Sequence, residues 1–194
     1  MPSVFLVSDT HFGHKGVCHF TLNDGVTKLR PFDTPEEMDE FMVEAWNAKV
    51  RPNDKVYHLG DVVMHRRSLS IMDRLNGDKV LIRGNHDIFK DDDYRKYFRE
   101  LRAYHVMNGM ILSHIPIHSD SLGRFGVNIH GHTHANRVMV PLATSGVLDK
   151  IDVRYHCVCV EQTDFAPILL EDVLDRIRAE GGVVGFKNGN GSAM

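Results

Sequence analysis

The sequence predicts an α/β fold, because segments typical of strands and of helices alternate along the first half of the chain. Residues 3–8 form a continuous apolar run, and residues 55–59 and 80–83 are again largely apolar and contain β-branched side chains. Residues 34–46 and 66–75 lie between these runs and carry apolar side chains at helical spacing. Two successive strand-helix-strand units predict neighbouring parallel strands in one sheet.

Length and charge limit the class of protein. A chain of 194 residues is expected to form one domain over residues 1–180, followed by a glycine-rich tail, 181–194, that is expected to be partly disordered. The formal net charge of -3 argues against strong non-specific nucleic-acid binding, which requires a basic surface. No apolar run is long enough to span a membrane and the N-terminus lacks a signal-peptide pattern, so we expect a cytoplasmic protein.

The first predicted helix has well-defined start signals. Thr34 is expected to be the N-cap, with Pro35 at the first helical position and Glu37 completing a capping box. The apolar side chains that follow predict one face packed in the core: Met38, Phe41, Met42, Ala45 and Trp46. The second helix is expected to stop at Asn76-Gly77.

The second half of the chain is predicted to be richer in strands. Residues 104–107 and 110–113 are expected to form a β-hairpin around the Asn108-Gly109 turn. The other predicted elements are a helix followed by a loop at 90–102, strands at 127–130 and 153–160, and a last helix that begins at Pro167.

Residue types that can bind metal ions follow the predicted strands, at the point where each strand ends. The chain has 13 histidines, well above ordinary usage, and several stand in short motifs with Asp or Asn. The residues at these strand ends are Asp9, His11, Asp61, Asn85, His86, His114, His132 and His134. Asp9 and His11 are expected to point to the same side of an extended segment. Because a sheet brings strand ends together, these side chains could surround two neighbouring cations.

Other interpretations of these residues were weighed. The donor set contains no thiolate, which favours Mn, Fe, Zn, Co or Ni, and the sequence does not choose among them. Cys157 and Cys159 could form a separate metal site, but no second cysteine pair accompanies them, and with Cys18 they are expected to be buried thiols. Taken alone, Asp9 and His11 could be a capped strand end with a surface histidine, and the Gly-Asn-His-Asp motif at 84–87 could be only a hairpin-type turn. His58 lies inside its predicted strand and is expected to be a core histidine rather than a ligand.

The motifs have a fixed order along the chain: Asp-x-His at 9–11, Gly-Asp at 60–61, Gly-Asn-His-Asp at 84–87, the lone His114, and Gly-His-x-His at 131–134. This order resembles that of the calcineurin-like metallophosphoesterases. The Ser-His-Ile-Pro-Ile-His run at 113–118 and the absence of a capping domain are similar to small single-domain bacterial and phage members, whereas many members have glycine at the position of Ser113. The resemblance implies a four-layer α/β/β/α sandwich of two mixed sheets flanked by helices.

Carried over by position, the resemblance implies a centre with two divalent metal ions. Asp9, His11, Asp61 and His134 would surround one ion, and Asp61, Asn85, His114 and His132 the other, so that Asp61 bridges them. His86 would donate a proton to the leaving oxygen or stabilise the transition state, and we expect Asp87 to orient its ring. Substrate contacts or structural roles are expected for His14, Arg83, His118 and Arg124.

The expected function is hydrolysis of small phosphodiesters, phosphomonoesters or both, nucleotide-like, by a hydroxide that bridges the two ions. Manganese is the first expected metal, with Fe, Zn, Ni and Co as alternatives. A catalytically silent scaffold or binding protein on the same fold is the alternative from another class, and missing ligands or a replaced His86 would mark it. A protein phosphatase is a further alternative, for which the chain has few residues to form a large recognition surface.

Overall fold

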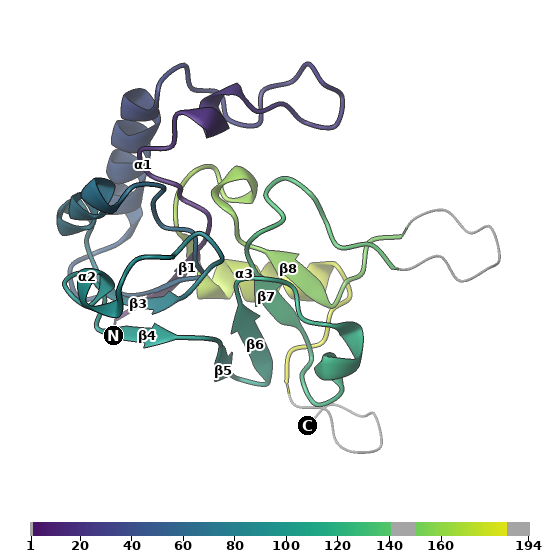
Figure 1. Ribbon diagram of the computed structural model, residues 1–194. Helices are drawn as coiled ribbons and strands as arrows, with labels where there is room; N and C mark the ends of the chain where they lie inside the picture. Colours follow the sequence, from purple (N-terminus) through teal and green to yellow (C-terminus); the bar gives the residue numbers. More distant parts are fainter. Residues whose placement is uncertain (1, 141–149, 186–194) are drawn as a thin grey trace.

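The computed structural model describes residues 2–140 and 150–185, which form two mixed β-sheets that pack against each other and are flanked by helices (Figure 1). The first sheet has the strand order β4-β3-β2-β1-β9, and the second has the order β5-β6-β7-β8. In the first sheet β9 is the antiparallel strand, and in the second sheet it is β5. The predicted fold class, two mixed sheets flanked by helices, is confirmed.

Three parallel strands of the first sheet reproduce the predicted strand-helix-strand order. They are β1 (Val4–Val7), β2 (Lys55–His58) and β3 (Asp78–Ile82). Phe5 and Val7 belong to the core under the first helix, whereas Leu6 belongs to the core between the two sheets. Parallel strands that are buried on both faces have continuous apolar sequences, which is why these runs do not alternate with polar residues.

Helix α1 (Pro35–Lys49) packs on the outer face of the first sheet and starts as predicted. The Glu37 backbone nitrogen donates to Oγ1 of Thr34 at 3.1 Å, but the Glu37 carboxylate accepts from Asp33, one residue before the position that a capping box requires. Four side chains are fully buried: Met38, Met42, Val43 and Trp46. Phe41 is 47% exposed, so the buried face is turned toward Val43 relative to the predicted one.

The second predicted helix is a 3₁₀ helix, η2 (Arg66–Arg74). Its buried side chains explain the difference, because Leu69, Met72 and Leu75 follow one another at intervals of three. In a 3₁₀ helix residues three apart lie on one line, so this spacing places all three in the core.

The second sheet contains β5 (His105–Met107), β6 (Met110–Ser113), β7 (Asn128–His130) and β8 (Tyr155–Cys157). The predicted hairpin is confirmed, because β5 and β6 pair antiparallel around Asn108 and Gly109, whose φ angles are 51° and 73°. Positive φ at both turn residues is typical of the tight hairpin turns that Asn-Gly favours. A short 3₁₀ helix, η3 (Ser119–Leu122), packs on the outer face of this sheet.

Three predicted elements were wrong in part. Residues 90–102 hold only one helical turn, α2 (Asp91–Tyr94), followed by β4 (Glu100–Arg102), which pairs with β3 as an edge strand. Within residues 153–160 the strand β8 covers only three residues, 155–157. The chain after Pro167 first pairs with β1 as β9 (Ile168–Leu169), and only then forms α3 (Leu170–Ala179). In the first and third cases pairing with a central strand overrides the local helical pattern.

The remaining short elements are the 3₁₀ helices η1 (Gly16–His19) and η4 (Val160–Gln162). Among the described residues, no helix has the length and apolar character needed to cross a membrane. The part of the predicted tail from residue 186 onward lies outside the described residues.

Candidate metal centre

The strand ends of the two sheets meet, and the loops that leave them are hydrogen-bonded to each other. The backbone nitrogen of Asp9, which follows β1 in the chain, donates to the carbonyl of Gly60, which follows β2, at 2.9 Å. A parallel backbone bridge joins Ser8, at the end of β1, to Cys159, just after β8. The polar residues that follow β1, β2, β7 and β8 therefore share one region of the molecule.

Five of the predicted ligand residues have a left-handed backbone. Their φ angles are 57° at Asp9, 48° at His11, 57° at Asp61, 68° at His132 and 51° at His134. The expected extended conformation of residues 9–11 is therefore wrong. A left-handed residue other than glycine costs about 1–3 kcal/mol, and such strain concentrates where a functional geometry is over-determined by the surrounding fold. The strand ends turn sharply here, which directs their side chains into one space.

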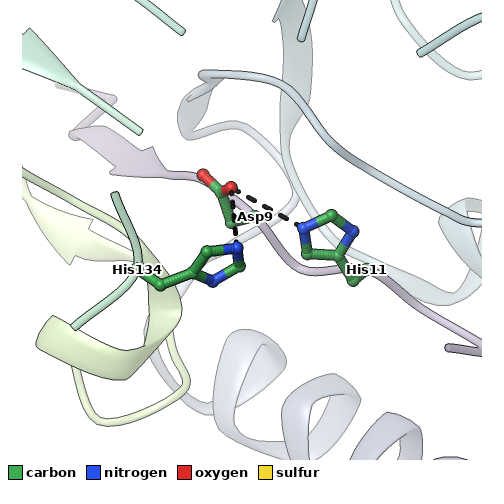
Figure 2. A group of neighbouring side chains, drawn as sticks. All are labelled: Asp9, His11 and His134. Atoms are coloured by element: carbon green, nitrogen blue, oxygen red, sulfur yellow. Dashed lines mark ion pairs between the residues drawn. The ribbon is translucent and has the colours of Figure 1, made fainter. Parts of the chain in front are cut away.

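The first cluster consists of Asp9, His11 and His134 (Figure 2). Oδ1 of Asp9 lies 3.7 Å from Nε2 of His11 and 3.7 Å from Nε2 of His134. The two imidazole rings are stacked, with centroids 5.3 Å apart. Oδ1 of Asp9 is fully buried and has no hydrogen-bond partner among the described residues. A buried carboxylate oxygen with no donor is costly, and a cation held between it and the two nitrogens would remove that cost.

The second cluster contains Asp61, Asn85, His114 and His132. Oδ1 of Asn85 lies 2.9 Å from Nε2 of His114 and 2.9 Å from Nδ1 of His132. Oδ2 of Asp61 lies 3.4 Å from the same His114 nitrogen. It also lies 3.7 Å from Nε2 of His11, so this one carboxylate oxygen faces both clusters. All seven predicted ligand residues are therefore brought together.

The hydrogen bonding of His114 shows that the second cluster fits a cation. Nδ1 of His114 lies 2.7 Å from the Leu59 carbonyl, which can only accept, so Nδ1 carries the proton. In the neutral ring Nε2 then presents a lone pair to the oxygens of Asp61 and Asn85. A second proton or a metal ion placed between them would join the nitrogen to these oxygens. Burial lowers the pKa of His114, but its contact with Asp61 and the charge of Asp9 outweigh burial and raise that pKa.

Asp9 is held by three donors to its other oxygen. Oδ2 accepts from Oγ of Ser8 at 2.5 Å, from the backbone nitrogen of His132 at 2.8 Å and from Sγ of Cys159 at 3.1 Å. Burial alone would raise the pKa of Asp9, but the neighbouring imidazoles, His11 first, lower it well below its ordinary value. The carboxylate is therefore fixed in orientation and ionised, with Oδ1 left to face the centre.

A buried ion pair behind His134 was missed from the sequence. Nδ1 of His134 donates to Oε1 of Glu161 at 2.9 Å, and Arg30 contacts the same oxygen at 2.7 Å. Arg30 also donates to the carbonyls of Asp9 and Thr10 at 2.6 and 2.8 Å. Burial raises the pKa of Glu161, but His134 and Arg30 outweigh it and lower that pKa. No local motif marks either residue, because they lie 131 positions apart.

Asp87 does not have the partner that was expected. Its carboxylate accepts from the backbone nitrogens of Asp61, Val62 and Gly84 at 2.8, 3.1 and 2.8 Å, and more weakly from the Tyr94 hydroxyl. These bonds fix the loop that carries Asp61. The expectation that Asp87 orients the His86 ring is therefore corrected: Asp87 positions the backbone beneath the second cluster.

Arg83 is also occupied structurally. Its guanidinium donates to the carbonyls of Asp87 and Phe89 at 2.5 and 2.7 Å and pairs with Asp91 at 2.6 Å. These contacts tie the segment after His86 back onto the end of β3. These contacts are the structural role that was the alternative to a substrate contact for Arg83.

His86 and His14 lie beside the first cluster. The His86 side chain is exposed, its ring centroid is 5.6 Å from that of His11, and its backbone nitrogen donates to Oδ1 of Asp61 at 2.8 Å. The His14 ring is 5.7 Å from that of His11. Burial, with the neighbouring His11, lowers the pKa of His14 to about 4, so the His14 ring is neutral near pH 7.

The two remaining candidates make only local contacts among the described residues. The His118 side chain is 76% exposed and accepts from the Asp120 backbone nitrogen at 3.3 Å as the N-cap of η3. The Arg124 guanidinium lies 6.0 Å from the centroid of the adjacent Phe125 ring. Neither side chain is brought to the two clusters by a contact that the structure shows.

Two of the proteins that the chain resembles have no assigned activity. No family model matches the chain. The uncharacterized protein MJ1445 from Methanocaldococcus jannaschii is 37% identical over 144 residues, which cover 71% of this chain and 73% of that protein. The crystal structure of AQ665, a protein of unknown function from Aquifex aeolicus, has a TM-score of 0.66 and 27% identity, covering 91% of this chain and all of that one. A weaker match, to an archaeal phosphodiesterase, has a TM-score of 0.43 and 16% identity over 81% of this chain and 82% of that one.

Proposed function

The chain belongs to the same family as the uncharacterized protein MJ1445, and from the geometry of its clustered side chains we propose that it is a dinuclear metal-dependent phosphoesterase of the calcineurin-like type. Its substrates are small phosphodiesters, phosphomonoesters or both. The observation that carries this proposal is the position of Asp61, whose Oδ2 lies 3.7 Å from Nε2 of His11 and 3.4 Å from Nε2 of His114. One carboxylate oxygen placed between two sets of donors is suited to bridge two cations.

The donor set supports hard or borderline divalent ions. Imidazole nitrogens, carboxylates and one amide oxygen suit Mn, Fe, Zn, Co or Ni, and manganese is the first choice for tests. Two such ions supply charge to polarise a phosphoryl oxygen and to lower the pKa of water held at the centre. Asp9 and Asp61 contribute -2 against their +4, and the charge of Glu161 is offset by Arg30, so the loaded centre attracts phosphate.

The protein's own residues supply positioning and a proton. Asp87 and the His86 backbone nitrogen hold Asp61 from two sides, which keeps its Oδ2 aimed at both clusters. Asn85 completes the second set without adding negative charge. His86 projects from the same loop next to His11 and is exposed, so its imidazole can reach a leaving oxygen and protonate it.

The presence of every donor supports an enzyme over a catalytically silent scaffold. A scaffold has no need for five strained, left-handed residues across the two clusters, or for a buried Asp9 oxygen that lacks a hydrogen-bond partner among the described residues. The same ligand set fits a structural metal site poorly, since a structural site usually closes around a single ion with four protein ligands.

The proposal is tested by hydrolysis of bis-4-nitrophenyl phosphate and 4-nitrophenyl phosphate with chelator-treated protein and added Mn²⁺. We expect metal-dependent release of nitrophenol, with Asp61→Asn reduced at least about 100-fold because the shared carboxylate is lost. Glu180→Gln, a carboxylate change outside the two clusters, serves as the control. Equal rates with and without metal, or full activity of Asp61→Asn, would refute the dinuclear proposal.

A further inference from the structure

A cavity of about 470 Å³ adjoins the first cluster and shares His134 with it. One wall is the segment 20–29, and the other is the loop His134-Ala135-Asn136. Its size lies within the range of small-molecule sites in proteins. Since His134 contributes to both, a ligand anchored at the metal centre can extend directly into this cavity.

The wall formed by residues 20–29 is a preformed hairpin. Thr21 and Lys28 form an antiparallel bridge, and Leu22 and Leu29 donate backbone hydrogen bonds across it at 2.7 and 2.8 Å. At its tip the Asp24 carboxylate accepts from two backbone nitrogens, each at 2.9 Å. The hairpin stands away from α1 as a separate arm (Figure 1). A wall that supports its own backbone can hold a ligand without first being ordered.

The lining is largely planar and partly apolar, and it contains one carboxylate, that of Asp24 at the hairpin tip. Phe20 is 51% exposed, and its ring is held edge to face against His14 at a centroid distance of 5.8 Å. Nδ2 of Asn23 donates to Oδ1 of Asn136 at 3.3 Å, so two carboxamides from opposite walls meet at the cavity. No Lys or Arg is among the residues that line it. The lining therefore has no Lys or Arg side chain that could bind a second phosphate group.

A second cavity beside the centre is different. It has a volume of about 350 Å³ and is lined by Arg83, Asn85, His114, Ile115 and neighbouring small residues. It is lined by no Phe, Tyr or Trp, and the guanidinium of Arg83 is already hydrogen-bonded to backbone carbonyls. Of these two cavities, the one beside Phe20 is therefore suited to an aromatic group.

We propose that the cavity between the Phe20 hairpin and Asn136 is a nucleobase site, so that the substrates are nucleotide esters whose phosphate lies at the metal centre. This deepens and rests on the proposed phosphoesterase function. A base stacks on the open part of the Phe20 ring, while Asn23 and Asn136 exchange their mutual hydrogen bond for bonds to its polar edge. Carboxamides can both donate and accept, which matches the mixed edge of a base.

The kinetic test compares two esters with the same leaving group, thymidine 5′-(4-nitrophenyl) phosphate and methyl 4-nitrophenyl phosphate, with Mn²⁺. The wild type should show a higher kcat/KM on the nucleotide ester. Phe20→Leu and Asn136→Ala should each reduce the ratio of the two kcat/KM values, by about tenfold for Phe20→Leu, since stacking of one base contributes about 1–3 kcal/mol. Phe20→Trp should retain the ratio because it keeps an aromatic face.

Val26→Ala is the matched control, because Val26 belongs to the same hairpin, is 84% exposed and does not line the cavity. Its ratio should equal that of the wild type. A ratio near one in the wild type, or a high ratio that Phe20→Leu and Asn136→Ala leave unchanged, would overturn the nucleobase site while the phosphoesterase function stands.

A binding measurement distinguishes failure of the nucleobase site from failure of the phosphoesterase function. In saturation-transfer NMR with adenosine 5′-monophosphate, the base protons should receive the strongest saturation from the wild type and much less from Phe20→Leu. Absence of turnover on both diesters would refute phosphodiesterase activity, and the NMR result would still decide the cavity. Saturation of the base that is equal in both proteins would overturn the proposed site.

Discussion

Nδ1 of His134 lies 2.9 Å from Oε1 of Glu161, on the side of the imidazole opposite the nitrogen that faces Asp9. A carboxylate behind a histidine fixes the tautomer and increases the basicity of the other ring nitrogen. Arg30 contacts the same carboxylate and two backbone carbonyls of the loop after β1. Glu161 and Arg30 therefore link the orientation of the His134 ring to the backbone of the loop that carries Asp9 and His11.

Replacing Glu161 by Gln should weaken metal binding at the first cluster. Gln can still accept from Arg30, but the negative charge that orients and polarises His134 is lost. We expect the affinity for Mn²⁺ to fall about 10- to 100-fold, as measured by isothermal titration calorimetry. Glu180→Gln, which changes a carboxylate paired with Arg137, should leave the affinity unchanged. Equal affinities of Glu161→Gln and the wild type would exclude the proposed role of the ion pair.

Replacing His86 by Ala should reduce turnover while the protein keeps its metal ions. The backbone nitrogen of residue 86 still donates to Asp61, so only the imidazole is removed. Loss of a general acid typically reduces kcat about 10²- to 10⁴-fold. Steady-state kinetics and metal analysis on the same sample check this, with His19→Ala, at an exposed histidine of η1, as the control. Unchanged kcat would eliminate His86 as the proton donor.

Replacing Gly84 by Ala should disrupt the second cluster. A Cβ atom at residue 84 would lie 2.6 Å from the Asp61 backbone nitrogen, and closer still to its carboxylate. The loop that carries Asp61 would have to move, so we expect loss of one Mn²⁺ per chain and a lower melting temperature. Gly123→Ala is the matched control, since its nearest neighbour would be an ordinary contact at 3.5 Å. Two ions bound by Gly84→Ala with wild-type affinity would contradict this prediction.

Acid should destabilise the metal-free protein through His58. The Gly60 nitrogen donates to Nδ1 of His58 at 3.2 Å, and Nε2 donates to the Thr10 hydroxyl at 3.0 Å, so the neutral ring is fully paired. Burial lowers the pKa of His58 to about 3, against 6.5 in the unfolded chain. The unfolded state therefore binds more protons between these values. The contribution of neutral His58 to the free energy of unfolding is present above pH 6.5 and is lost as the pH falls toward 3. At about 1.4 kcal/mol per unit of pKa shift, the loss is on the order of a few kcal/mol.

Urea unfolding in the presence of chelator at pH 7 and pH 5 measures this effect. His58→Gln removes the titrating group and should show a smaller loss of unfolding free energy between the two pH values than the wild type. His19→Gln, at an exposed position, should behave as the wild type does. The prediction fails if His58→Gln and the wild type lose the same free energy.

The main elements of the site could be predicted from the sequence because each motif is local. Asp9, Asp61, Asn85 and His132 each follow a short apolar run, and the parallel order of β1, β2 and β3 brings three of these ends together. The left-handed conformation of the turns could not be predicted, because glycine is the residue type that reliably indicates a positive φ, and these residues are Asp and His.

The remaining features depend on contacts between distant segments. Glu161 belongs to a single helical turn and becomes important only because the end of β8 lies beside β1. Asp87 follows His86 in sequence, but its carboxylate turns back to the backbone of residues 61 and 62 instead of toward the imidazole. Strand β4 was missed because three residues with charged neighbours carry little pattern, and pairing with β3 determines their conformation.

The most direct test of the central claim is anomalous diffraction from crystals of the protein soaked in Mn²⁺ and measured above and below the manganese absorption edge. The account predicts two anomalous peaks, separated by about 3.5–4 Å, with the Asp61 carboxylate between them. One ion should contact Asp9, His11 and His134, and the other should contact Asn85, His114 and His132. A single peak, or two peaks that do not share Asp61, would contradict the dinuclear centre.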